Sequence, residues 1–257
     1  MAIRLKTPRQ IEQMREAGRI VKTVLSRLGE MIAPGVTTQD LDSEAERLCR
    51  QMGGTCLFKG VVIRPEAGPF PGNICASINE EVVHGVPSNR ALAPGDVVSV
   101  DFGVLLNGWC GDAAETFPVG QVDPGVRHLL DVTRNTLELA IRMCRPGEKW
   151  STVARAMQEY VEGEGLSVVR DFVGHGIGQE MHEAPKVPNF VSRELLARDI
   201  FLQEGLVLAV EPMVNMGSPD CTCWRDRWPV VTKDRKPSAH FEHTLAVTAK
   251  GVTVLTG

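Results

Sequence analysis

The sequence has no uncharged apolar run that approaches the ~18 residues of a transmembrane helix, so no membrane partner is expected. The opening stretch, from Met1 to Gln10, has no apolar core after its first positive charges, which predicts no secretory signal there. An excess of positive charge is also missing, since 28 Lys and Arg stand against 32 Asp and Glu, a net charge of −4. Proteins that bind phosphate backbones normally carry a basic excess, so no nucleic-acid partner is expected.

Paired cysteine spacing is absent as well. The 7 cysteines are scattered and odd in number, which fits reduced thiols in a cytoplasmic protein better than a disulfide framework. No stretch is of low complexity or long enough to be a linker. With 43% hydrophobic and 23% charged residues, the composition is that of an ordinary globular chain, and residues 1–257 are interpreted as one domain.

Helix signals begin close to the start of the chain. Thr7 and Gln10 form a capping box before a long amphipathic stretch that we expect to end before Pro34. A second helix is predicted from Thr37 or Thr38 onward.

The same layout recurs later in the chain. Pro34 to Pro146 and Gly53 to Gly165 are both offsets of 112 residues, and Ser151 is expected to cap the fourth helix. This spacing predicts an internal duplication, with halves of roughly 1–120 and 121–257 that each hold two helices followed by strands.

Two aspartates lie on the strongest hairpin signal of the sequence. With Asn107 and Gly108 as the two-residue turn, paired positions sum to 215, so Asp112 faces Gly103. Side chains alternate between the faces of a strand, so Asp101 and Asp112 share one face as diagonal neighbours, within roughly 7 Å between their β-carbons. A polar, solvent-facing side of a half-exposed sheet is the alternative interpretation of this pair.

Two further acids argue against that alternative. Glu211 ends the apolar run Leu206–Val210 and precedes Pro212, which favours a strand end that opens into a cavity. Glu242 also lies among strand-forming residues. Acids placed together in such strands repel each other and lose hydration, so they need cations or protons.

His175 is the fifth member of the set, in the segment Val-Gly-His-Gly-Ile-Gly. A dinucleotide-binding loop is the alternative here, but that motif needs a different spacing and a following helix, which Pro185 opposes. We expect the flanking glycines to leave the imidazole approachable from either face. Two Asp, two Glu and one His suit two divalent ions that share bridging oxygens.

With these residues in place, the sequence resembles the type I methionine aminopeptidases, which remove the initiator Met from new chains. The matching segments, in chain order, are Asn79–Pro87, the Asp101…Asp112 hairpin, Gly174–Pro185, Val210–Asn215 and Ser238–Thr244. Similarity extends to the opening helix and to Lys233–Arg235, so it covers essentially the whole chain. The resemblance implies the α/β pita-bread fold with pseudo-twofold symmetry, which agrees with the repeat of 112 residues.

The resemblance also implies two divalent metal ions, which can be Co, Mn, Fe or Zn. Asp101 would bind one ion, Asp112 and Glu242 would bridge both, and His175 and Glu211 would complete the other site. A hydroxide shared by the ions would attack the carbonyl of the first residue.

Three residues receive catalytic roles from the same resemblance. Glu211 would pass protons, His182 would donate to the developing oxyanion, and His84 would contact the leaving amide nitrogen. The substrate would be the N-terminal Met of nascent polypeptides with a small second residue. The protein would then act as a cytoplasmic monomer near the ribosome.

The pocket for the Met side chain is expected to be small and apolar. Cys75, Phe70 and Trp228 match pocket positions of the family, with Cys56 as a fourth. The sequence departs from the family pattern in the segment 57–74, which is longer than in compact type I members, and at Met181, where an aromatic is common.

Other classes remain as alternatives. A prolidase or proline-specific aminopeptidase of the same fold uses similar ligands, but such enzymes usually carry an additional amino-terminal domain, whereas residues 1–55 here predict only two helices. A binding protein that lost its metals would normally lack at least one ligand. His240 has the strand parity of Glu242 and could support it, whereas His243 should point to the opposite face.

Overall fold

The structure, a computed structural model, describes residues 2–257. Its α-helices are α1 (Pro8–Met31), α2 (Thr38–Gln51), α3 (Pro124–Met143), α4 (Trp150–Gly163) and α5 (Arg193–Ala197), with a short 3₁₀ helix at Pro65–Ala67. Within residues 2–257, none of these helices is both long enough and apolar enough to cross a bilayer.

Two helix pairs recur at the predicted spacing. Helices α2 and α4 each contain 14 residues, and their first residues, Thr38 and Trp150, are 112 positions apart. The capping prediction for Ser151 was wrong, because α4 begins one residue earlier. Ser151 instead directs its hydroxyl and its backbone N–H to the carboxylate of Asp199, at 2.5 and 3.1 Å. An acid from a distant segment therefore caps this helix end.

A nine-stranded sheet forms the centre of the fold, with the order β1-β4-β5-β14-β9-β7-β8 and with β2 beside β4 and β15 beside β14. The pairings in this sheet are antiparallel. Its strands are β1 (Thr55–Cys56), β2 (Cys75–Ile78), β4 (Val97–Leu106), β5 (Trp109–Pro118), β7 (Gly174–Gly176), β8 (Glu183–Val187), β9 (Val207–Val210), β14 (Glu242–Thr248) and β15 (Gly251–Val254).

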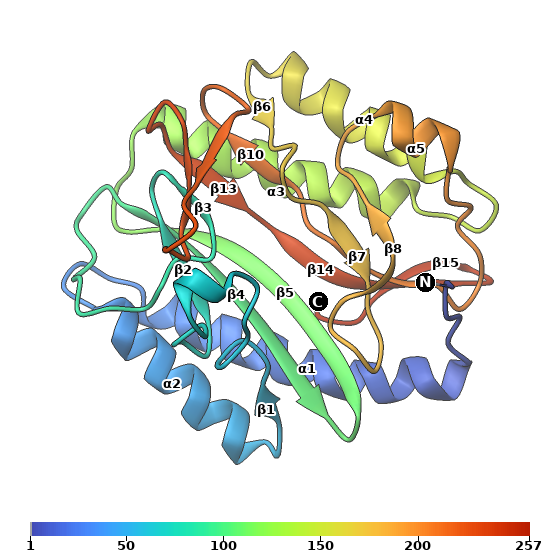
Figure 1. Ribbon diagram of the computed structural model, residues 1–257, viewed down its shortest axis with the longest axis horizontal. Helices are drawn as coiled ribbons and strands as arrows, with labels where there is room; N and C mark the ends of the chain where they lie inside the picture. Colours follow the sequence, from blue (N-terminus) through green and yellow to red (C-terminus); the bar gives the residue numbers. More distant parts are fainter. Residues whose placement is uncertain (1) are drawn as a thin grey trace.

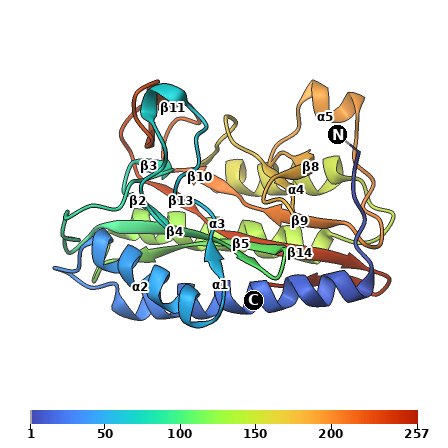
Figure 2. The same ribbon diagram turned by 60° about the horizontal axis from the view of Figure 1, so that its bottom comes forward.

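Two three-stranded sheets stand beside the large one. The first has the order β13 (Ser238–His240), β10 (Met213–Asn215) and β6 (Ser167–Val168), and the second has β11 (Cys221–Cys223), β12 (Val230–Thr232) and β3 (Glu81–Val83). Figure 1 shows the large sheet with the helix pair α1–α2 at one end and α3–α4 at the other. In Figure 2, α1 and α2 lie below the sheet, while β11 and α5 stand above it.

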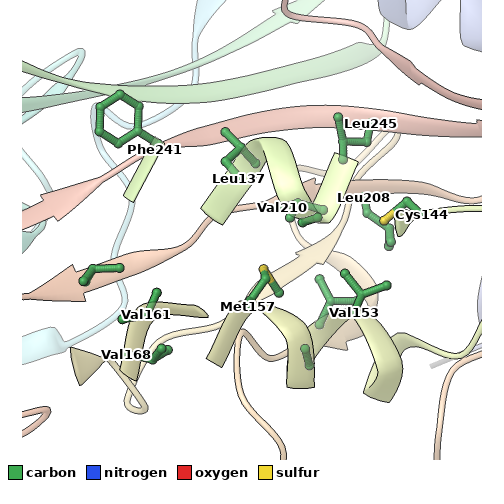
Figure 3. Packing of buried hydrophobic residues seen from close by; sticks show 14 of the residues in the cluster. Leu137, Cys144, Val153, Met157, Val161, Val168, Leu208, Val210, Phe241 and Leu245 are labelled. Atoms are coloured by element: carbon green, nitrogen blue, oxygen red, sulfur yellow. The ribbon is translucent and has the colours of Figure 1, made fainter. Parts of the chain in front are cut away.

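The helices bury one face of the sheet. Leu137 of α3 and Met157 of α4 belong to the same buried cluster as Leu208 and Val210 of β9 (Figure 3). Because side chains alternate along a strand, Ala209 points to the opposite face. Helix packing therefore leaves the second face of the sheet for other uses, and that face carries the acids.

Candidate metal centre

The predicted hairpin is present with the predicted register. Strands β4 and β5 pair Asp101 with Ala114 and Gly103 with Asp112. Asn107 and Gly108 form the turn with φ of 50° and 82°, the positive angles that a tight two-residue hairpin turn requires. Asp101 and Asp112 therefore lie on one face of the sheet, two strand positions apart.

The neighbouring strand brings a third acid into the same row. Ala114 of β5 pairs not only with Asp101 of β4 but also, on its other side, with Glu242 of β14. Asp101, Ala114 and Glu242 thus lie in line across three adjacent strands and on one face. Cys75 of β2 pairs with Asp101 and extends this row by a fourth strand.

Strands β9 and β7, which follow β14 in the sheet, supply the remaining candidate ligands. Ala209 of β9 pairs with His175 of β7. Glu211 lies two positions after Ala209, directly after the end of β9. An extended backbone places side chains two positions apart on the same face of the sheet. The distances agree, since His175 Nε2 lies 3.5 Å from Glu211 Oε1 and 3.8 Å from Asp112 Oδ2.

A cavity of about 610 Å³ opens over this face. Ten of the eleven residues proposed from the sequence line it: Phe70, Cys75, His84, Asp101, Asp112, His175, His182, Glu211, Trp228 and Glu242. Other lining residues include Phe58, Met181 and His240.

Cys56 does not line the cavity, which corrects the expectation for this residue. It pairs with Val104, whereas Gly103, one position earlier on β4, shares the face of Asp112. The Cys56 side chain therefore packs into the core on the helix side of the sheet. The pairing between β1 and β4 decides this, and no motif near Cys56 shows it.

The carboxylates lack the partners that a buried acid needs. Asp101 Oδ1, Asp112 Oδ1 and Glu242 Oε1 are buried with no hydrogen-bond partner among residues 2–257. Burial raises the pKa of Asp101 to about 7. Burial and the charges of neighbouring acids raise the pKa of Asp112, Glu211 and Glu242 well above the ordinary range. Such a cluster is stable only with protons or cations between its members.

The tautomer of His175 fits a metal ligand. Its Nδ1 lies 2.9 Å from the carbonyl oxygen of Gly176, and since a carbonyl can only accept, Nδ1 carries the proton. Burial, with a smaller contribution from His182, lowers the pKa of His175 to about 4, so the ring is neutral at pH 7 and Nε2 is free. The lone pair of Nε2 faces the carboxylates of Asp112 and Glu211. A cation bound between the nitrogen and these carboxylates would make this arrangement favourable. Three residues, Asp112, His175 and Glu242, each offer one possible ligand atom, and these atoms lie within 4.8 Å of one another.

The glycines on either side of His175 have a structural role that the sequence did not indicate. A Cβ on Gly174 would collide with the carbonyl oxygen of Ala209, and a Cβ on Gly176 would collide with that of Ala184. These glycines allow β7 to pack closely between β9 and β8. They thereby hold His175 at its position in the sheet.

His84 and His182 lie on the rim of the acidic cluster. The His182 ring centroid is 4.4 Å from that of His175. The His84 ring stands edge-on to Phe172 and Trp228, with centroid distances of 5.5 and 6.2 Å. His84 has φ 61°, a left-handed conformation that is costly for a non-glycine residue and concentrates at functional sites.

His84 is partly buried, and one of its ring nitrogens is buried and free. Its Nδ1 has no hydrogen-bond partner among the described residues. Burial, followed by the charge of Arg64, lowers the pKa of His84 to about 4. At pH 7 this residue is therefore a neutral imidazole that can bond to a molecule in the cavity.

An apolar pocket adjoins the row of acids. Phe58, Phe70, Cys75 and Trp228 form one buried cluster, and Met181 packs against it. The rings of Phe70 and Trp228 meet edge to face with centroids 5.0 Å apart. Because Cys75 pairs with Asp101, this pocket lies directly beside the carboxylates.

His240 lies where its strand parity indicated. It lines the cavity, and its buried Nε2, which has no hydrogen-bond partner within residues 2–257, is 3.7 Å from Glu211 Oε2. His243 points to the other face, where its Nδ1 lies 2.9 Å from the hydroxyl of Thr256.

An ion pair that sequence reasoning missed supports the turn before β8. Lys6 Nζ donates to Glu183 Oε2 at 2.8 Å, and the two side chains are only 4% and 5% exposed. Glu183 follows His182 and also accepts the backbone N–H of Gln179. The pair ties the amino-terminal segment to the residue beside His182, across 177 positions of sequence that no local pattern spans.

The raised carboxyl pKa values predict how the stability of chelator-treated protein depends on pH. Above about pH 7.5 the unfolded chain has ionised its acids and has neutralised almost all of its histidines, so the buried histidines add little to the slope. The folded cluster still holds protons there, because the pKa is about 7 for Asp101 and well above the ordinary range for Asp112, Glu211 and Glu242. A folded state that binds more protons loses stability as pH rises.

We therefore expect the Tm of EDTA-treated protein to fall between about pH 7.5 and 9. Protein with added Mn²⁺ should show a smaller fall over the same range, because the cation replaces the protons. Thermal melts in the two conditions test this. A Tm of the stripped protein that is flat or rising over this range would contradict it.

Comparison with known proteins points to one family. The model of metallopeptidase family M24 matches residues 12–249. Methionine aminopeptidase 1 of Bacillus subtilis is 46% identical over 251 residues, which are 98% of each chain. The crystal structure of a methionine aminopeptidase from Thermotoga maritima has a TM-score of 0.93 at 40% identity and covers 99% of both chains. A prolidase from Pyrococcus furiosus shares the fold, with a TM-score of 0.76 at 21% identity over 98% of this chain and 65% of that one.

Proposed function

Because the chain belongs to metallopeptidase family M24, we propose that it is a dinuclear metal-dependent methionine aminopeptidase that removes the N-terminal Met of nascent polypeptides. The observation that carries this proposal is the set of buried acids without partners, with the free Nε2 of His175 among them and an apolar pocket beside them. We further propose that the enzyme prefers substrates with a small second residue. The protein would act as a cytoplasmic monomer close to the ribosome.

The residues present fit a pair of divalent ions. Asp101 would hold one ion, Asp112 and Glu242 would be shared, and His175 and Glu211 would complete the second site. When bound, the ions supply a Lewis acid for the carbonyl and a water of lowered pKa. Carboxylates and one imidazole accept Mn, Fe, Co or Zn, so the identity of the metal depends on supply as well as on geometry.

The apolar pocket would bind the side chain of the first residue. Phe70 and Trp228 present ring faces and edges, which interact favourably with a thioether sulfur. Cys75 belongs to the pocket and pairs with Asp101, so the pocket lies directly beside the acids. A Met residue whose side chain fills the pocket would therefore have its backbone carbonyl at the acids. This arrangement favours cleavage after one terminal residue.

Three residues would handle protons and hydrogen bonds around that carbonyl. The raised pKa of Glu211, due first to burial, suits a group that takes up and passes on a proton. His182 would donate to the oxygen as negative charge develops on it. His84, neutral and with a free Nδ1, would bond to the amide nitrogen that leaves.

Metal removal and a small set of peptides test the proposal. Purified protein is stripped with chelator, Mn²⁺ or Co²⁺ is added back, and release of the first residue is measured for Met-Ala-Ser, Leu-Ala-Ser and Ala-Pro. We expect metal-dependent release of Met from the first peptide only. Cleavage of Ala-Pro instead would indicate a prolidase, and bound metal without any cleavage would indicate a binding protein.

A further inference from the structure

The segment between β1 and β2 places apolar side chains at the edge of the cavity. Val61 and Ile63 line the cavity and are nevertheless 38% and 58% exposed. Val62 lies between them and is 57% exposed, but it does not line the cavity. These three consecutive aliphatic residues are exposed, so they do not belong to the hydrophobic core. We call the two that line the cavity, Val61 and Ile63, the apolar rim.

The apolar rim is held firmly against the pocket wall. Gly60 donates its backbone N–H to Phe70, and Phe70 donates its own to Val61, both at 2.8 Å. The guanidinium of Arg64 donates to the carbonyl oxygens of Trp224 and Trp228 at 2.8 and 2.7 Å. The same guanidinium carbon lies 5.7 Å from the ring centroid of Trp228. A surface fixed in this way loses little conformational entropy when a ligand covers it.

The apolar rim is placed to contact the substrate itself, and this inference rests on the proposed function. The first residue would fill the pocket of Phe70 and Trp228, and its carbonyl would lie at the acids. The rest of the polypeptide must then leave through the opening of the same cavity, which Val61 and Ile63 line. The rim is therefore continuous with the surface that binds the first residue.

We propose that Val61 and Ile63 bind an apolar side chain of the substrate beyond its second residue. The enzyme then selects among nascent chains by their third or fourth residue, in addition to the Met and the small residue after it. Covering one exposed aliphatic side chain removes enough apolar surface from water to change kcat/KM by about threefold to tenfold.

Paired peptides with a matched control variant test this inference. The ratio of kcat/KM for Met-Ala-Leu-Leu-Ser to that for Met-Ala-Ser-Ser-Ser is measured with Mn²⁺ for the unchanged protein and for Ile63→Ser, Val61→Ser and Val62→Ser. We expect a ratio of about three to ten for the unchanged protein, a ratio near one for Ile63→Ser and a reduced ratio for Val61→Ser. Val62→Ser, at a position of similar exposure outside the cavity, should keep the ratio.

Each outcome of this experiment decides the inference. A ratio near one for the unchanged protein, with Met released from both peptides, overturns the inference and leaves the proposed function intact. An equal loss of the ratio in Val62→Ser and Ile63→Ser also overturns it, because a general effect of the segment would then explain the result. No release of Met from either peptide would overturn the proposed function itself. Since the ratio compares two substrates of one variant, partial misfolding does not change it.

Discussion

Asp112→Asn is expected to lower Met release by at least ~10³-fold and, at the same time, to stabilise the metal-free protein. Asp112 is 2% exposed, and burial together with the charge of Asp101 raises its pKa well above the ordinary range. An amide of the same shape removes a buried acid from a cluster of like charges, which should raise the unfolding free energy of the stripped protein by about 1–3 kcal/mol near pH 8. The same change removes a ligand that the proposal shares between both ions.

The opposite signs of these two effects make the prediction specific. Metal content after dialysis, kcat with Mn²⁺ and the Tm in EDTA are measured for Asp112→Asn and for Glu115→Gln. Glu115 lies on the same strand, is 41% exposed and does not line the cavity, so its variant should keep both metal and activity. A fully active Asp112→Asn protein would remove this residue from the site. A variant less stable than the unchanged protein in EDTA would refute the electrostatic account.

His84→Ala is expected to reduce kcat by about 10²-fold while the metal content stays unchanged. The residue lines the cavity with an unpartnered Nδ1, and no ion pair joins it to the acids within the part of the chain that the structure describes. Its loss should therefore remove a hydrogen bond to the reacting amide and leave the metal ligands in place. Steady-state kinetics and metal analysis on the same samples measure the two quantities.

Backbone strain at this position calls for a second variant. Because His84 has φ 61°, Ala would be strained there, whereas Asn tolerates the left-handed region. His84→Asn should show the same loss of kcat with a smaller loss of Tm, and His128→Ala, at an exposed histidine, should match the unchanged protein. Normal turnover in His84→Asn would exclude His84 from the mechanism, and loss of metal would make it part of the ligand set.

Local pattern was enough for the central hairpin and the long helices. The Asn107-Gly108 turn determines the register of β4 and β5, and the two-residue period of a strand then places Asp101 and Asp112 on one face. The helix pairs follow from amphipathic period and terminal signals, and their repeat after 112 residues is visible in both sequence and structure. Strand context made Glu211 and Glu242 candidate ligands, and the family resemblance then gave each its role, because no local pattern joins these two acids to the hairpin.

Tertiary structure alone decided what depends on pairing between distant segments. The β5–β14 register places Glu242 in the row of Asp101, and the β1–β4 register turns Cys56 to the helix side, although both residues were plausible site members from the sequence. The contact of Asp199 with the start of α4 and the Lys6–Glu183 pair were likewise invisible beforehand. A one-residue change in register moves a side chain to the other face of a sheet, and that register is set by the packing of the whole sheet rather than by the residues nearby.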